Sequence, residues 1–212
     1  MRPSFGRDGA VTLLDEIVVK SLGKADYASS LEAMREFTAR RDESSADELW
    51  LLEHPPVYTL GQGARSRAVA NGIPVVRADR GGDITYHGPG QVVLYALVDL
   101  ARRGITVKRF VWLLEQAVMD LVGPRAERKP GAPGVYAGGA KVAALGIRVR
   151  HGRAYHGLSL NVDMDLTPFS AIDPCGYPGL AVTQLRDLGL SETVESAGAK
   201  LARLLVNRIE HA

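Results

Sequence analysis

The chain has 212 residues, of which 46% are hydrophobic and 24% charged, so its composition is that of an ordinary globular domain. Lysine and arginine number 26 against 24 aspartate and glutamate, and this formal net charge of +2 is too small for a chain built around nucleic acid. The longest wholly apolar run, residues 92–98, is far shorter than the roughly twenty residues of a membrane span. We therefore expect one cytoplasmic domain over residues 1–212 that binds neither nucleic acid nor membrane and that acts as a monomer.

Three helices are predicted from apolar residues that recur every three or four positions. The first covers about 26–40, where Tyr27, Leu31 and Met34 alternate with charged residues. The second covers 107–121, between Gly104 and Gly123. The third is predicted over 194–205, near the end of the chain.

Short β-like runs lie between the first two helices, at 48–52, 57–60, 73–77 and 91–100. After the second helix, segments 142–150 and 153–163 are typical of a hairpin that turns at His151 and Gly152. Leu158, Leu160 and Val162 are expected to face the core, with Ser159, Asn161 and Asp163 on the opposite face. Helices mixed with adjacent strands predict a single α+β domain. Two long connections, 78–90 and 167–180, stay unpaired in this scheme, and we expect them to be functional.

Cys175 is the only cysteine, which excludes an internal disulfide and a cysteine-rich metal site and is typical of a reducing compartment. It lies in the sequence Asp-Pro-Cys-Gly-Tyr-Pro-Gly over 173–179. Prolines stiffen such a loop, and glycines let a substrate or another backbone approach closely. This setting favours a displayed nucleophile, and the alternative is a buried, inert thiol.

A thiol needs a neighbouring base or cation to ionise near neutral pH. Lys141 follows two glycines, at a predicted turn ahead of the hairpin, and it is either such a helper or a solvated turn residue. His87 and His156 are the other candidates, or else structural histidines. His54 and His211 are uninformative, and no histidine pair has the spacing of metal ligands.

Residues 80–91 hold four glycines beside an arginine, a threonine and a histidine. Such a segment exposes backbone N–H groups to a ligand. Nucleotide-binding motifs do not fit this chain: residues 61–63 lack the third glycine of a dinucleotide fingerprint. Residues 134–141 are spaced wrongly for a P-loop, and Val142 stands where a magnesium-binding hydroxyl would be needed.

Four segments together resemble the lipoyl(octanoyl) transferase family. They are RGGDITYHGPGQ at 80–91, GGAKVAALGIRV at 138–149, HGLSLNVDMDL at 156–166 and DPCGY at 173–177, in the family's order, with EHPPVYTLGQ at 53–62 as further support. Ser159 stands where the family often has alanine, and Asp83-Ile84 is one variant of a tolerant pair. The resemblance implies the fold of biotin and lipoate protein ligases, an α+β domain of mixed β-sheets flanked by helices.

The same resemblance implies site residues. Cys175 would be the acyl-accepting nucleophile and Lys141 its catalytic partner, with no metal. The substrate pocket would be lined by Arg80, Gly81, Gly82, Asp83, Ile84, Thr85, Tyr86, His87, Ala144, Leu145, Gly146, Gly157, Leu158 and Ser159.

The implied reaction moves an octanoyl group from octanoyl-acyl carrier protein, through a thioester on Cys175, to a lysine of a lipoyl domain. Acceptors would be the lipoyl domains of 2-oxoacid dehydrogenase complexes and the glycine cleavage H protein, in the first step of endogenous protein lipoylation. Because a thioester is already activated, no ATP, metal or other cofactor is expected.

Three alternatives stay open. They are an ATP-dependent lipoate or biotin ligase on the same fold, a cysteine hydrolase that uses His87 or His156, and an acyl-binding module without catalysis.

Overall fold

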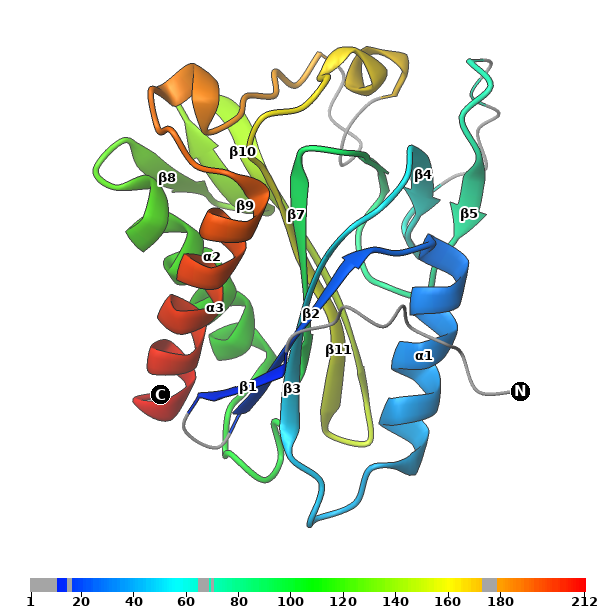
Figure 1. The fold of residues 1–212 in the computed structure, drawn as a ribbon, viewed down its shortest axis with the longest axis vertical. Helices are drawn as coiled ribbons and strands as arrows, with labels where there is room; N and C mark the ends of the chain where they lie inside the picture. Colours follow the sequence, from blue (N-terminus) through cyan, green and yellow to red (C-terminus); the bar gives the residue numbers. More distant parts are fainter. Residues whose placement is uncertain (1–10, 15–16, 65–68, 70, 173–178) are drawn as a thin grey trace.

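The computed structural model describes residues 11–14, 17–64, 69, 71–172 and 179–212, so the predicted nucleophile Cys175 lies outside the described residues. The described chain forms two β-sheets and three α-helices. Figure 1 shows two of the helices against one face of the larger sheet, with the third helix and the smaller sheet on the other side. The predicted α+β class, with mixed sheets flanked by helices, is confirmed.

The larger sheet has eight strands in the order β1-β2-β3-β7-β11-β10-β9-β8. Its pairs are antiparallel except β2 with β3, so the sheet is mixed. The strands are β1 (Val11–Leu14), β2 (Ile17–Lys24), β3 (Asp47–Glu53), β7 (Gln91–Leu97), β8 (Ala126–Lys129), β9 (Ala132–Ala137), β10 (Ala140–Arg150) and β11 (Arg153–Asn161).

The smaller sheet has the order β5-β4-β6, with β4 parallel to β5 and antiparallel to β6. Its strands are β4 (Val57–Leu60), β5 (Val75–Arg77) and β6 (Ile84–His87). A short 3₁₀ helix, η1 (Thr167–Ala171), packs on this sheet through Phe169, which contacts the Tyr86 ring edge-on.

The three predicted helices are confirmed as α1 (Tyr27–Arg40), α2 (Val107–Val122) and α3 (Val194–Glu210). α1 begins where the Asp26 carboxylate accepts a hydrogen bond from the Ser29 N–H at 2.9 Å, which satisfies one of the free donors of the first turn. α2 and α3 begin in the same way at Thr106 and Thr193. None of the described helices is both long and apolar enough to cross a membrane.

Side chains on the central strands point alternately to the two faces of the large sheet, so they pack in two separate cores. On β7, Val92, Leu94 and Ala96 pack with α2 and α3, while Val93 and Tyr95 lie on the face that α1 covers. On β11, Leu158 and Leu160 join the core beneath α2 and α3, as their spacing predicts. The α1 face of β7, β10 and β11 is therefore the face on which the smaller sheet and the candidate site lie.

The prediction that residues 78–90 stay unpaired is wrong. Residues Ile84–His87 form strand β6, and Thr85 pairs with Thr59 of β4. Only five residues separate Gly82 from Gly88, so the apolar character of this strand is easily hidden between turn signals. Strands β1, β2, β8 and β9 are likewise absent from the prediction. β8 and β9 read AERK and APGVYA, whose charged residues, proline and glycine weaken the β signal.

Candidate active site

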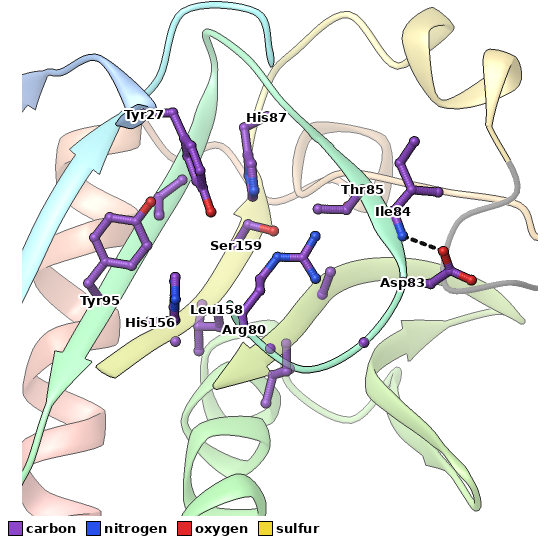
Figure 2. Close-up of a pocket in the computed structure, with 16 residues that line it drawn as sticks. Tyr27, Arg80, Asp83, Ile84, Thr85, His87, Tyr95, His156, Leu158 and Ser159 are labelled. Carbon is purple, nitrogen blue, oxygen red and sulfur yellow. Dashed lines mark hydrogen bonds between the residues drawn. The ribbon is translucent and has the colours of Figure 1, made fainter. Parts of the chain in front are cut away.

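A pocket lies between the α1 face of the large sheet and the segment that leads into β6 (Figure 2). It contains about 480 Å³ of space, counting open solvent at its mouth. Most of the predicted substrate-binding residues line it, from three separate segments of the chain: Arg80, Gly82, Asp83, Ile84, Thr85, His87, Ala144, Leu145, Gly146, Gly157, Leu158 and Ser159.

Two residues of the predicted set do not line this pocket. Alternation along β6 turns Tyr86 away from Thr85 and His87, and its ring packs with Tyr58 and Phe169 in the core of the small sheet. Gly81 lies on the outer side of the same segment, where it borders a second surface pocket.

Four residues outside the predicted substrate-binding set complete the wall: Tyr27, Val93, Tyr95 and His156. Tyr27 begins α1, and Val93 and Tyr95 belong to β7. Their signals in the sequence are those of ordinary core positions, so sequence pattern alone could not distinguish them from packing residues.

Strand register explains why distant motifs meet. Ala144 pairs with Ser159 and Gly146 with Gly157 across β10 and β11. Ser159 pairs in turn with Val93 on β7. The GGAKVAALGIRV and HGLSLNVDMDL segments thus form neighbouring strands. Their residues that face α1 lie side by side in the wall of the pocket.

Close backbone approach fixes the rim of the pocket. The Gly81 N–H donates to the Ile147 carbonyl at 3.0 Å, which seats the segment from Arg80 onto β10. A Cβ atom at Gly146 would lie 2.9 Å from the Gly81 carbonyl oxygen, and one at Gly157 would lie 2.1 Å from that of Leu94. Glycine is therefore required at both strand positions.

Arg80 ties the glycine-rich segment to the small sheet. Its buried guanidinium donates to the Thr59 carbonyl at 2.7 Å and to the Thr59 hydroxyl at 2.8 Å. It also donates to the Gly81 carbonyl at 2.9 Å. These bonds hold a positive charge at the pocket wall, where Figure 2 shows the Arg80 side chain crossing the pocket.

Lys141 is not at a turn, as the sequence predicts, but in β10, and its side chain is only 3% exposed. The reading of this residue as a solvated lysine is therefore wrong. Its ammonium nitrogen Nζ donates to the Pro133 carbonyl at 3.2 Å and lies 5.1 Å from the centre of the Tyr136 ring. A cation–π contact and a carbonyl acceptor both stabilise the charged ammonium group of a buried lysine.

Lys141 lines a smaller cavity next to the main pocket. The two share Thr85, Ala144 and Ser159 as wall residues. Phe169 and Val182, which also line the smaller cavity, belong to the chain on either side of residues 173–178. The Lys141 side chain therefore lies in a cavity adjacent to the main pocket.

Three histidines surround the main pocket. His87 is fully buried, with Nδ1 2.7 Å from the Gln91 side-chain oxygen and Nε2 3.3 Å from the Thr59 hydroxyl. Burial, with the nearby positive charge of Arg80, lowers the pKa of His87 to about 3. Its ring stacks on Tyr27, so the side chain is an uncharged part of the wall at neutral pH.

His54, which the sequence presents as uninformative, belongs to this cluster. Its Nδ1 lies 2.7 Å from the Ala25 carbonyl, so that nitrogen carries the proton, and its Nε2 lies 2.7 Å from the Tyr95 hydroxyl. Burial lowers the pKa of His54 to about 4. The following Pro55-Pro56 pair reads as a loop signal and conceals this position.

His156 has the third imidazole. Its Nε2 lies 2.8 Å from one carboxylate oxygen of Asp79. The other carboxylate oxygen accepts hydrogen bonds from the Tyr155 hydroxyl at 2.8 Å and from Arg35 at 3.1 Å. Burial lowers the pKa of His156, and the Asp79 carboxylate only partly opposes this effect. For Asp79, burial would raise the pKa, but the hydrogen bonds from His156 and Tyr155 outweigh burial and hold it well below its usual range.

Among the described residues, no group of three or more His, Cys, Asp or Glu side chains is placed to hold a metal ion. The predicted roles of Cys175, Lys141 and the pocket residues stay predictions at this point.

Comparison with solved structures shows the fold. Lipoate-protein ligase A bound with ATP is 16% identical, with a TM-score of 0.73 over 91% of this chain and 85% of that one. Biotin protein ligase from Aquifex aeolicus is 9% identical, with a TM-score of 0.54 over 93% of this chain and 71% of that one. The predicted relation in fold to biotin and lipoate ligases is confirmed.

Comparison of sequences shows the family. The profile of the lipoyl protein ligase A/B catalytic domain matches residues 26–204. An octanoyltransferase of Thiobacillus denitrificans is 59% identical over 91% of this chain and 91% of its own length. An octanoyltransferase of Azoarcus sp. is 55% identical over 95% of this chain and 92% of its own length. The chain therefore belongs to the lipoyl protein ligase A/B catalytic domain family and is an acyltransferase.

Proposed function

We propose that this chain transfers an octanoyl group from octanoyl-acyl carrier protein to a lysine of lipoyl domains, with Cys175 as the acyl carrier and Lys141 as its catalytic partner. The observation that carries the proposal is the buried amine of Lys141 in a cavity that shares three wall residues with a largely apolar pocket. The high identity to proteins named octanoyltransferases supports the acyl group.

The described flanks of the Cys175 segment support the pairing of the two catalytic residues. Phe169 and Val182, one on each flank, line the Lys141 cavity. On the following flank, the Lys141 N–H donates to the Ala181 carbonyl at 2.8 Å, and the Thr183 N–H donates to the Lys141 carbonyl at 2.9 Å. Cys175 follows Ile172 by only three residues, and three residues span at most about 11 Å.

In the first half-reaction, the Cys175 thiolate attacks the carbonyl carbon of the octanoyl thioester. The positive charge of the Lys141 ammonium favours the thiolate over the thiol. Backbone N–H groups of the glycine-rich segments stabilise the oxyanion of the tetrahedral intermediate. The bond to the carrier sulfur then breaks, the Lys141 ammonium gives its proton to the carrier thiolate, and Cys175 keeps the octanoyl group as a thioester.

In the second half-reaction, the amine of the acceptor lysine attacks the same carbonyl carbon. An amide bond forms, the bond to the Cys175 sulfur breaks, and the attacking amine loses a proton. Lys141 in its neutral form takes this proton. The thioester supplies the activation, so the cycle needs no ATP.

The main pocket holds the octanoyl chain. Its wall includes the side chains of Val93 and Ala144, together with the glycines of β10 and β11. Burial of methylene groups contributes about 0.8 kcal/mol each, so the eight-carbon chain brings several kcal/mol of binding. The neutral His54 and His87 add no charge to this environment.

The partners follow from the chemistry of the two half-reactions. The donor is octanoyl-acyl carrier protein, and the acceptors are the lipoyl domains of 2-oxoacid dehydrogenase complexes and the glycine cleavage H protein. The chain acts as a single domain over residues 1–212, as a monomer in the cytoplasm. A small net positive charge suits acidic partner domains by electrostatic steering.

Two other reactions use the same fold or the same thiol. A ligase would require ATP, so transfer measured with and without ATP separates it from the proposal. A hydrolase with His87 or His156 as base would release free octanoate. His87 has both ring nitrogens within hydrogen-bond reach of other side chains, which disfavours that role.

The decisive experiment is an intact-mass measurement after incubation with octanoyl-acyl carrier protein. We expect one added octanoyl group that disappears when a lipoyl domain is supplied, with octanoyl-lysine as the product. Cys175→Ser is the control, because the chain has no second cysteine. An unchanged mass, or an adduct that persists in Cys175→Ser, would overturn the covalent mechanism.

A further inference from the structure

His156 has an unusual backbone for a residue inside a strand. Its φ is +61°, a left-handed conformation that non-glycine residues adopt rarely and at a cost in free energy. Its neighbours Ala154 and Leu158 face the core beneath α2 and α3, so alternation would place the His156 ring there too. The ring instead stacks on Tyr155 and bonds to Asp79, on the pocket side.

Asp79 fixes this unusual orientation. The carboxylate accepts a hydrogen bond from the N–H of His156 Nε2, because a carboxylate at neutral pH has no proton to donate. The neutral ring therefore presents Nδ1 as a bare acceptor. Tyr155 and Arg35 hold the second carboxylate oxygen, so Asp79 is anchored on both sides.

Two buried polar atoms on the pocket wall have no hydrogen-bond partner among the described residues. They are Nδ1 of His156 and the hydroxyl of Tyr27. The two residues are 1% and 2% exposed, respectively. Figure 2 shows the Tyr27 hydroxyl pointing into the pocket. It also shows Tyr27, Tyr95 and His156 on the side opposite Thr85, which is shared with the Lys141 cavity.

The length of the pocket matches an eight-carbon chain. His156 lies on this far side of the pocket, and Ser159, which also lines the Lys141 cavity, lies three residues later in β11. At about 3.3 Å per residue the separation is about 10 Å. An extended alkyl chain with bonds of about 1.5 Å advances about 1.25 Å per carbon, so eight carbons also span about 10 Å.

We propose that Tyr27 and His156 form a polar end wall that sets the length of the acyl chain. This inference rests on the proposed octanoyl transfer, since it takes the carbonyl group to lie at the Ser159 end. An octanoyl chain stops short of the two polar atoms, and water or a polar group satisfies them. A longer chain presses methylene groups against them and leaves both unsatisfied, which is costly in a buried site.

The test compares acyl groups of eight, ten and twelve carbons, each supplied on acyl carrier protein, by the kcat/KM for transfer to a lipoyl domain. Tyr27→Phe removes the hydroxyl and keeps the ring, so it isolates polarity from shape. We expect the preference for eight over ten carbons to fall about tenfold in this variant. His156→Gly suits the positive φ and removes the ring, and we expect its preferred length to move to ten or twelve carbons.

Tyr58→Phe is the matched control. The Tyr58 hydroxyl donates to the Pro168 carbonyl, and Tyr58 does not line the pocket, so its chain-length preference should equal that of the parent. If Tyr27→Phe and folded His156→Gly both keep the parental preference, the end wall is refuted. If only His156→Gly changes it, shape rather than polarity sets the limit and the polar part of the proposal is wrong.

A second measurement separates this inference from the proposed function. The Kd values of free octanoate, decanoate and dodecanoate report the same end wall without any chemistry. Parental protein that binds octanoate best but transfers nothing from the carrier would refute the proposed transfer alone. Transfer in the parent, with equal length dependence of Kd in parent and Tyr27→Phe, would refute the polar end wall alone.

Discussion

Lys141 pairs with Val182 in an isolated parallel β-bridge, closed by hydrogen bonds from the Lys141 N–H to Ala181 and from the Thr183 N–H to Lys141. The main chain of one predicted catalytic residue thus holds the segment that leaves the other. A change that shifts β10 at Lys141 would move both the amine and this segment. The side-chain role of Lys141 is therefore best tested by substitutions that keep its backbone and packing.

We expect Lys141→Met to slow alkylation of Cys175 by iodoacetamide near neutral pH, because the variant keeps the buried stem but removes the charge that favours the thiolate. Octanoyl transfer should fall by about 10²- to 10⁴-fold, the usual contribution of acid–base catalysis. The single cysteine makes alkylation specific.

Lys129→Met is the matched control for this prediction. Lys129 also lies over the Tyr136 ring, with its Nζ 4.5 Å from the ring centre, but it does not line the Lys141 cavity. Its alkylation rate should equal that of the parent. An equal rate in Lys141→Met would remove the assigned activating role.

Ala144→Leu should fill space at the boundary of the two cavities, because Ala144 lines both. We expect octanoyl transfer to fall roughly tenfold or more, while a butanoyl group is affected less. The comparison requires kcat/KM for both acyl groups. Arg150→Leu, at the exposed end of the same strand, controls for a general effect of leucine in β10. Equal losses for the two acyl groups in Ala144→Leu would show that Ala144 does not border the acyl chain.

Gly157→Ala should destabilise the fold by about 3 kcal/mol, because the new Cβ would lie 2.1 Å from the Leu94 carbonyl oxygen and would force β7 and β11 apart. Gly198→Ala is the counterpart in α3. There the Cβ would meet side-chain atoms no closer than 3.6 Å, so the helix should gain up to about 1 kcal/mol. Urea unfolding measures both, and a destabilised Gly198→Ala or an unaffected Gly157→Ala would contradict the contacts.

As the pH is lowered, the free energy of unfolding should begin to fall at a pH well above the pKa of ordinary carboxylates. Burial lowers the pKa of His54 to about 4 and that of His87 to about 3, while an unfolded histidine titrates near about 6.5. Below about pH 6.5 the unfolded chain therefore binds more protons than the folded one. Stability is complete above that pH and is lost as the pH falls towards about 4.

Each of these two histidines should cost about 2 kcal/mol of unfolding free energy between pH 7 and pH 5. Urea unfolding at the two pH values checks this. His87→Gln should reduce the difference by about half, and His211→Gln, at the exposed chain end, should leave it unchanged. A parental protein equally stable at both values would show that the histidines are not held neutral.

Sequence patterns that extend over many residues predicted the three helices and the central hairpin. The periodicity of α1, α2 and α3 and the hairpin of β10 and β11 were visible because each repeats over ten or more residues or has a clear turn. β6 was not visible, since a strand of four residues between glycines carries too little pattern. The burial of Lys141 was also hidden, because the glycines before it signal a turn, and β9, with which it pairs, carries a weak strand signal.

The residues of the candidate site also fall into those that the sequence predicts and those that it does not. Motif residues such as Arg80, Thr85 and Ser159 stand out by composition, and the structure brings them around one pocket. Tyr27 and Tyr95 give only the signal of a helix face and a buried strand. Their place in the wall depends on the packing of α1 against the sheet, which no local pattern encodes.

β10 carries Lys141 near its start and Gly146 farther along, and it is paired on its two sides with β9 and β11. The amine and the acyl slot therefore belong to one continuous strand in the interior of a sheet. In the proposed transfer, this strand keeps the spacing between amine and slot constant, whichever carrier or acceptor domain binds. One reaction geometry can in this way serve several protein substrates.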